Sequence, residues 1–293
     1  MLIAASVLAV AGLLWCLFVG MLWWQQDRLV FVGWGFGLAA VTEMASTDER
    51  LEVVMPDGVR VVGGLRRAVG VSRGLLLVFG GNAEDNTWRL RHFDGWLDDV
   101  DIATFYYRGY GPSGGTPNQA VLVDDAARIH DHLHDLLKPA RVVASGFSLG
   151  SGVVAQLARN RPLAGAILVT PFDSIAAVAA ERYPFVPVRW LLRHPFRSDE
   201  ALADIEVPVA VIAAERDQVV SPARTRQLLA ALLCPLPVVW IEGANHINIY
   251  ERSEYRLAFR DALQRLLGAS PSAGPVDTFE QVQTVCAAVD KGR

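Results

Sequence analysis

The sequence predicts an α/β fold with a mostly parallel central sheet, helices on both of its faces, a short cap and one N-terminal transmembrane helix. Three observations predict it. An uncharged apolar stretch opens the chain, short apolar runs then alternate with segments of helical spacing, and an aromatic- and arginine-rich segment interrupts that alternation. Such alternation is typical of a buried parallel sheet, because each crossover between parallel strands takes a helix. With 293 residues, 52% of them hydrophobic, the chain is long enough for one large domain with appendages.

The first 25 residues predict a membrane anchor. Residues 2–24 carry no charged side chain and are enough to cross a hydrocarbon core of about 30 Å as a helix. A cleaved signal peptide is the alternative, but it would carry Lys or Arg before a shorter apolar stretch, so an uncleaved anchor is favoured. Arg28 favours a cytoplasmic domain, whereas long domains are exported regardless of charge, so the side stays open. Scarce lysine beside abundant Arg and Ala indicates a bacterial origin, so the anchor predicts a single-pass protein of the bacterial inner membrane.

Residues 26–268 are expected to form the α/β domain. Its sheet is expected to start with two antiparallel strands within residues 51–63, joined by a Pro-Asp-Gly turn. Residues 174–203 fit no strand and are expected to form the cap, and residues 269–293 form a tail with a helix candidate at 278–288. The apolar runs predict strands at 74–79, 102–106, 142–144, 166–169, 207–213 and 237–241, and the helical spacing predicts helices at 120–137, 221–233 and 250–267.

Ser148 lies where a strand pattern ends and a small-residue helix pattern begins, in the run Gly146-Phe-Ser148-Leu-Gly150. Glycines two places to either side let the strand and the helix approach without a Cβ clash. This layout is typical of a nucleophile elbow and predicts covalent acyl-transfer chemistry. The same five letters also occur in flexible loops, so the interpretation depends on the partners of the serine.

A serine hydroxyl needs a histidine base, and the histidine needs an acid to fix its tautomer. Asp217 follows the predicted strand at 207–213, and His246 follows the next one at 237–241. The carboxyl ends of parallel strands meet at one edge of the sheet, where ligands bind. The order Ser148, Asp217, His246 is also the order of α/β serine hydrolases, and it predicts a catalytic triad.

Two other acids compete with Asp217. Asp173 also follows a strand, but aspartate in that position suits a helix N-cap. Glu215 is two residues before Asp217 and is expected to point to the opposite side. Asp217 is preferred because its strand directly precedes the one that leads to His246.

The tetrahedral oxyanion needs two backbone donors. Leu149, directly after the serine, is expected to supply one. The second is expected from Asn82, which follows Gly80 and Gly81 at the end of the first predicted parallel strand. A simple glycine turn is the alternative, and the downstream elbow favours an oxyanion loop.

Charge and composition argue against two other classes of function. The net charge of -4 and the absence of a long basic run give no footprint for nucleic acid. The cysteines have no CxxC spacing, and of the histidines in 130–134 only His130 and His134 share a helix face, without a third ligand. A solvated helix face is therefore favoured over zinc, and no metal or cofactor is expected. His92 and His194 receive no role.

Several motifs resemble those of the α/β-hydrolases, in particular of membrane-anchored serine hydrolases whose motifs read roughly FHGNA, YRGYGxSxGxP, GxSxG, GxxD and a histidine loop. Here they stand as Phe79-Gly-Gly-Asn-Ala83, Tyr107-Arg-Gly-Tyr-Gly-Pro-Ser-Gly-Gly-Thr-Pro117, the elbow, Ala214-Glu-Arg-Asp217 and Ala244-Asn-His246. Gly80 departs from the family's usual histidine, which is expected to alter loop stiffness and pocket polarity.

The resemblance implies an α/β-hydrolase fold, a catalytic triad of Ser148, Asp217 and His246, and a substrate-selecting cap. The leading hypothesis is a membrane-anchored serine hydrolase that cleaves an acyl ester or thioester of a small molecule or lipid. One alternative is a membrane-tethered binding module without catalysis, and another is a peptidase or acyltransferase with the same triad. The sequence predicts no oligomeric state.

Overall fold

Eight strands form the central sheet in the order β1-β2-β4-β3-β5-β6-β7-β8. The computed structural model describes residues 2–35, 48–82 and 84–268. β1 pairs with β2 and β2 with β4 in antiparallel fashion, and the remaining neighbours are parallel. The predicted mostly parallel sheet with an antiparallel start is therefore confirmed. The strands are β1 (Asp48–Val54), β2 (Arg60–Arg66), β3 (Leu75–Phe79), β4 (Asp101–Phe105), β5 (Val142–Phe147), β6 (Gly165–Val169), β7 (Val209–Ala214) and β8 (Val239–Ile241).

The turn between β1 and β2 is set by its own residues. Gly58 has a φ of 79°, a conformation that glycine adopts without a steric penalty. The Met55 amide donates to the Val59 carbonyl at 2.8 Å, and the Val59 amide donates to Asp57 Oδ1 at 3.2 Å. The local sequence thus closes this hairpin as expected.

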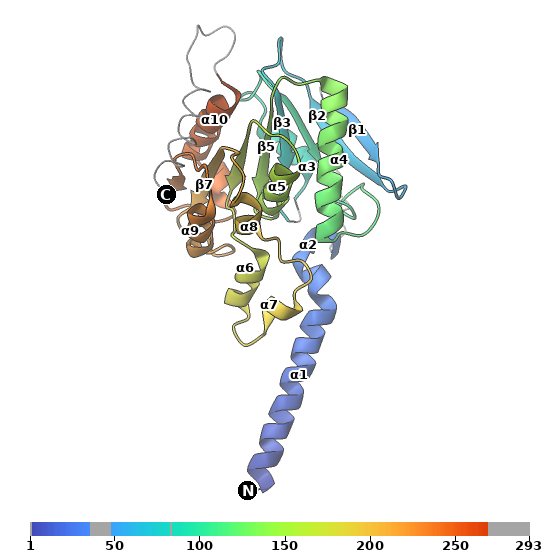
Figure 1. The fold of residues 1–293 in the computed structure, drawn as a ribbon, viewed down its shortest axis with the longest axis vertical. Coiled ribbons are helices and arrows are strands. Elements are labelled where there is room, and N and C mark those ends of the chain that lie inside the picture. Colours follow the sequence, from blue (N-terminus) through green and yellow to red (C-terminus); the bar gives the residue numbers. More distant parts are fainter. Residues whose placement is uncertain (1, 36–47, 83, 269–293) are drawn as a thin grey trace.

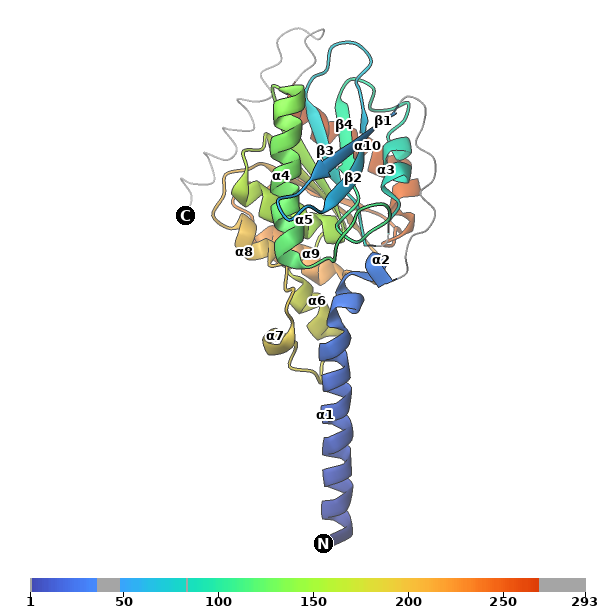
Figure 2. The same ribbon diagram turned by 90° about the vertical axis from the view of Figure 1, so that its right-hand side faces the viewer.

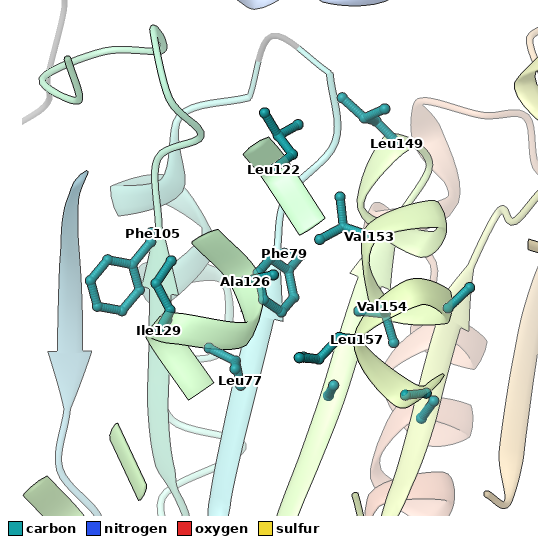
Figure 3. Close-up of a cluster of buried hydrophobic side chains, with 14 of the residues drawn as sticks. Leu77, Phe79, Phe105, Leu122, Ala126, Ile129, Leu149, Val153, Val154 and Leu157 are labelled. Carbon is teal, nitrogen blue, oxygen red and sulfur yellow. The ribbon is translucent and has the colours of Figure 1, made fainter. Parts of the chain in front are cut away.

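Helices cover both faces of the sheet (Figures 1 and 2). Along β3, Leu75 and Leu77 belong to one core cluster, whereas Leu76 and Val78 belong to the other. This alternation follows from the two-residue period of a strand. Figure 3 shows the first cluster, in which side chains of α4 and α5 meet those of the sheet. That face carries α4 (Gln119–Leu137), α5 (Leu149–Asn160) and α9 (Pro222–Ala231), and the other carries α3 (Asn86–His92), the 3₁₀ helix η1 (Asn248–Glu251) and α10 (Ser253–Leu267).

The N-terminal helix α1 (Leu2–Val30) projects from the domain as a single rod (Figure 1). Its apolar window has a mean hydropathy of 2.6 and none of it is buried. The helix continues past the expected anchor boundary at residue 25 and is followed by the short α2 (Val32–Gly35). Its last turns contact the domain, where Gln26 is buried. The sequence also predicts an amphipathic connector at residues 25–44, and residues 36–44 of it lie outside the described residues.

The predicted cap segment forms three short helices, α6 (Ile175–Arg182), α7 (Val188–Leu191) and α8 (Ser198–Leu202). α6 and α7 lie beside the domain-proximal half of α1 in both ribbon views. Ser174 caps α6, since its side chain accepts from the Ala177 amide at 3.1 Å. The predicted tail at 269–293, with its helix candidate, lies outside the described residues.

Candidate active site

Ser148 occupies the tight turn between β5 and α5. Its φ of 49° and ψ of −111° form a conformation that side chains rarely adopt. The turn is held by the Ser148 amide, which donates to the Val169 carbonyl at 3.0 Å, and by Ser151 Oγ, which donates to the Ser148 carbonyl at 2.6 Å. A Cβ on Gly146 would lie 2.3 Å from the Gly150 carbonyl oxygen, so the close approach requires glycine. This is the geometry expected of a nucleophile elbow.

The structure brings Ser148, His246 and Asp217 into one hydrogen-bonded chain. His246 Nε2 lies 3.0 Å from Ser148 Oγ, and His246 Nδ1 lies 2.7 Å from Asp217 Oδ2. The other oxygen, Asp217 Oδ1, accepts from the amides of Val219 and Val220 at 2.9 and 2.8 Å. Asp217 is nearly buried, so its carboxylate is fixed toward the imidazole. This arrangement can draw a proton from the serine hydroxyl.

The loop that carries His246 is hydrogen-bonded to the loop that carries Asp217. The Arg216 amide donates to the Ala244 carbonyl at 2.8 Å. Asn245 and Asn248 bracket the histidine, since each backbone amide donates to the other's side-chain oxygen at 2.8 to 2.9 Å. These contacts fix the backbone on both sides of His246. The imidazole is therefore positioned by its loop as well as by the two contacts of its ring.

The two competing acids have other partners. Asp173 Oδ1 accepts from the Ser174 amide at 2.8 Å and Oδ2 pairs with Arg224 at 2.9 Å, while burial raises the pKa of this carboxyl group. The expected N-cap role belongs to Ser174 instead, one residue later. Glu215 Oε2 accepts from the Gly243 amide at 2.8 Å, so this acid contacts the loop that leads to His246.

The two predicted oxyanion residues flank the nucleophile. Leu149 is buried and opens α5 directly after the serine. A Cβ built on Gly81 would lie 3.9 Å from Ser148 Cβ, and Asn82 is the next residue. Ala83, the last residue of that motif, lies outside the described residues. A negative charge that develops here would also face the N-terminus of α5.

Two tyrosines that received no role in the sequence analysis hold the loop of Gly80 and Asn82. Tyr107 Oη donates to the Gly80 carbonyl at 2.7 Å, and Tyr110 Oη donates to Asn82 Oδ1 at 2.8 Å. Both rings are buried, and burial raises the pKa of both phenols, so they stay protonated donors. The long tyrosine- and glycine-rich motif that contains them was the signal for this role.

Arg108, between these tyrosines, fixes their loop to the domain. Its guanidinium contacts Asp125 of α4 at 2.6 and 2.9 Å and also pairs with Asp57 in the β1–β2 turn. Hydrogen bonding to Asp125 raises the pKa of Arg108, so the cation is permanent. The motif therefore supports the loop of Gly80 and Asn82.

Glu84 and Arg89 also hold the loop of Gly80 and Asn82. Glu84 accepts from the Gly81 amide and pairs with Arg89. Arg89 is 1% exposed, and its guanidinium carbon lies 3.6 Å from the centre of the Phe147 ring, one residue before the nucleophile. The buried cation is stabilised by the carboxylate and the ring face.

A cavity of about 920 Å³ opens beside Ser148. Its size is at the upper end of the usual range for small-molecule sites. Both α1 and the cap contribute to its walls, so the two segments predicted to lie outside the sheet line the site. The walls are largely apolar and include Val19, Leu22, Trp23, Leu29 and Val30 of α1, Ile175, Val178, Val186, Val188 and Leu191 of the cap region, and Trp88 and Tyr250 near the catalytic loops.

Asn82 also links its loop to α1. Its Nδ2 donates to the Val30 carbonyl at 2.8 Å, which satisfies one of the free carbonyl groups at the end of that helix. His194, which received no role from sequence, joins α1 to the cap region, since its Nε2 lies 2.9 Å from Asp27 Oδ1. The end of α1 is therefore part of the site's framework.

The histidines of α4 lie apart from this arrangement. The rings of His130 and His134 stack at 6.2 Å, and His130 Nδ1 lies 3.1 Å from Asp131 Oδ1. Across the ranges that the structure describes, no three His, Cys, Asp or Glu side chains gather as a metal site would require.

His92, which packs behind the cavity-lining Trp88, is expected to make the stability of the fold depend on pH. It stacks on Trp88 with ring centres 5.0 Å apart, and burial lowers its pKa to about 4. An unfolded histidine titrates near 6.5, so between these values the unfolded chain binds the extra proton and stability falls as pH falls. His92→Phe keeps the aromatic packing and removes this titration.

For the detergent-solubilised chain, we expect the melting temperature of His92→Phe to fall roughly 2 to 4 °C less than that of the parent between pH 7 and pH 5. His132→Phe, whose ring lies in solvent, is the control and should keep the parent's dependence. Equal losses in the parent and in His92→Phe would contradict the assignment.

Comparisons with known proteins agree with this geometry. Residues 115–255, which include Ser148, Asp217 and His246, match the family model described as serine hydrolase. An uncharacterised protein of Mycobacterium tuberculosis (strain H37Rv) is 32% identical over 272 residues, with 90% of this chain and 95% of that protein covered. The lysophosphatidylserine lipase ABHD12 of Danio rerio is 31% identical over 138 residues, with 41% of this chain and 36% of the lipase covered.

Solved structures share the fold. An esterase of Pyrococcus furiosus superposes with a TM-score of 0.64 at 16% identity, over 79% of this chain and 97% of the esterase. A serine hydrolase of Xanthomonas campestris, described as lacking a lid, gives 0.59 at 18% identity, over 78% and 100%.

Proposed function

The chain belongs to the serine hydrolase family of the α/β-hydrolase superfamily, and we propose that it is a membrane-anchored enzyme that cleaves an acyl ester or thioester. The observation that carries the proposal is the hydrogen-bonded chain from Asp217 through His246 to Ser148, which opens into a largely apolar cavity. Such a cavity suits an acyl chain, and the elbow suits an acyl-enzyme intermediate.

In the proposed reaction, Ser148 Oγ attacks the acyl carbonyl carbon while His246 Nε2 takes the hydroxyl proton. Asp217 stabilises the resulting imidazolium, and the amides of Leu149 and Asn82 stabilise the oxyanion. The tetrahedral intermediate collapses, the alcohol or thiol leaves with the proton from His246, and the acyl group stays on the serine. Water then attacks the acyl carbonyl carbon and gives a proton to His246. The imidazolium passes this proton to Ser148 Oγ as the second tetrahedral intermediate collapses, which releases the carboxylic acid and restores the serine.

The contacts of α1 support a retained anchor rather than a cleaved signal. Gln26 Nε2 donates to the Leu191 carbonyl at 3.2 Å, and Gln26 Oε1 accepts from the Arg193 amide at 2.7 Å. Phe31, directly after the helix, is fully buried. Loss of α1 would remove one cavity wall and leave Asn82 without its Val30 partner, so the folded site depends on this helix.

A lipid ester is the favoured substrate class within this proposal. The apolar cavity walls and the apolar helix support it, and so does the activity in the name of the Danio rerio lipase. The test uses the full chain in detergent micelles, a fluorophosphonate probe and p-nitrophenyl esters of increasing chain length. We expect labelling of the parent but not of Ser148→Ala, and faster turnover of longer chains.

Each outcome of this test separates the hypotheses. Equal labelling of the parent and Ser148→Ala would overturn the assignment of the nucleophile. Labelling of Ser148 without turnover of any ester would favour a peptidase or an acyltransferase. Absence of both would favour a tethered binding module.

A further inference from the structure

The cap reaches far along the apolar helix. Trp15 Nε1 donates to the carbonyl of Phe185 at 3.0 Å, although the two residues are 170 positions apart. We define residues 183–191, from the end of α6 through α7, as the cap tip. In Figures 1 and 2 this segment lies alongside α1, well beyond the edge of the sheet.

The position of Trp15 on α1 fixes the depth of the cap tip. A span takes about 20 residues, and a helix rises 1.5 Å per residue, so Trp15 lies about 20 Å from the start of α1 at Leu2. That distance is shorter than the hydrocarbon core of about 30 Å. If α1 spans a bilayer from its first turn, Trp15 lies inside the hydrocarbon, and the cap tip lies at the same depth. The tip would then enter the leaflet by about 10 Å.

The exposed side chains of the cap tip fit that position. Phe185 and Trp190 are 83% and 87% exposed and do not line the cavity. Phe185 lies in the turn before α7 and Trp190 in α7 itself, and large exposed apolar side chains of this kind mark sites of contact with a membrane or a protein. Arg182 precedes this segment in the chain and Arg189 lies within it, and both are exposed. Exposed arginines at a membrane surface can reach lipid phosphates while their stems stay in contact with apolar groups. Arg193 instead joins the cap region to α1, since it pairs with Asp27 at 3.3 Å and its guanidinium lies 5.3 Å from the centre of the Trp23 ring.

The cavity reaches along α1 to Val19, about one helical turn nearer the domain than Trp15. Its walls include Val19 and Leu22 of α1 together with Tyr183 and Val186 of the cap tip, and Ser148 lines the same cavity. The space between α1 and the cap therefore connects the nucleophile with the level of the bilayer that α1 would occupy. A chain that enters there stays in contact with apolar groups throughout its path.

We propose that the cap tip is inserted into the leaflet next to α1, and that the cavity takes the acyl chain of a lipid laterally from that leaflet. This proposal rests on the proposed function, because it needs an anchored α1 and an acyl substrate. It commits to one occupant of the exposed tip, the bilayer. The continuity of the tip with an apolar helix of spanning length supports this choice over a soluble partner.

Fluorescence quenching tests the insertion without reference to catalysis. The full chain carrying Cys16→Ser and Phe185→Cys, labelled with an environment-sensitive dye, is reconstituted into phosphatidylcholine vesicles with phosphatidylglycerol. We expect lipids with nitroxide-labelled acyl chains to quench the dye, and aqueous iodide to leave it nearly unquenched. Val69→Cys in the same background is the matched control, because Val69 is similarly exposed but lies in the loop that leads to the amino end of β3, opposite the site. It should show the reverse pattern.

Iodide quenching at position 185 equal to that at position 69 would overturn the proposal. So would shielding from both quenchers, since a protein partner or a second copy would then cover the tip.

Kinetics test the delivery route. For Phe185→Ser and Trp190→Ser we expect kcat/KM to fall about tenfold on a long-chain ester carried in vesicles, with turnover of a soluble short-chain ester unchanged. Val69→Ser should change neither rate. Equal losses on both substrates would overturn lateral entry and indicate damage to the site. If the parent cleaves no ester at all, the proposed function fails, whereas the quenching result still decides on insertion.

Discussion

Replacing His246 by alanine is expected to lower kcat/KM for a soluble ester by about three orders of magnitude or more. The reason is geometric: its Nε2, 3.0 Å from Ser148 Oγ, is the group placed to take the hydroxyl proton. Without a base the serine is a weak nucleophile at neutral pH. Steady-state kinetics on the detergent-solubilised chain measure the loss, and a circular dichroism spectrum equal to that of the parent shows that the fold persists.

Asp217, the acid that contacts His246, has a matched control in Glu215, two residues before it in the sequence. Asp217→Asn should also lower kcat/KM by orders of magnitude, because the amide favours the wrong imidazole tautomer. Glu215→Gln should stay within about tenfold of the parent, since a glutamine oxygen can still accept from the Gly243 amide. Asp173→Asn likewise leaves the histidine contact intact. A larger loss in either control than in Asp217→Asn would reassign the acid.

Gly150→Ala is expected to abolish the folded protein or to reduce its yield severely. A Cβ at this position would lie 2.1 Å from the Phe79 carbonyl oxygen and 2.7 Å from that of Gly80. Both neighbours are backbone atoms at the end of β3, so relief requires α5 to move away from the sheet. Overpacking of this kind costs about 3 kcal/mol or more, a large share of the stability of a domain.

Thermal melting and fluorophosphonate labelling of Ser148 measure this effect together. Gly114→Ala is the matched control, because a Cβ there would meet its nearest atoms at 3.6 and 3.8 Å, which is ordinary contact. We expect it to melt within a few degrees of the parent and to label fully. A normally folded and labelled Gly150→Ala would mean that the elbow tolerates a wider approach of strand and helix.

The N-terminal helix α1 forms part of the cavity wall and lies beside the exposed tip of the cap. The contacts within the sheet, at the elbow and between Ser148, His246 and Asp217 all lie inside the α/β domain. The cavity, in contrast, is lined in part by α1. Removal of α1 would expose Phe31 and the apolar cap wall. A truncated domain is therefore a poor substitute for the full chain in functional work.

The sequence by itself determined the features that depend on local patterns. Short apolar runs identified the parallel strands, and the Pro-Asp-Gly turn identified the first hairpin. The order of Ser148, Asp217 and His246 after successive strands predicted that they would meet, because parallel strands end at one edge of the sheet. The short α3 escaped prediction, since seven residues show too little periodicity.

The tertiary structure alone decided what forms the cavity and what supports the loop of Gly80 and Asn82. Trp15 meets Phe185, and Gln26 meets Leu191, across 170 and 165 positions of the chain. Asn82 likewise contacts Val30, and no periodicity or spacing encodes that pair. Such contacts result from the packing of whole elements, which brings distant side chains together only after the sheet, the cap and α1 have taken their places.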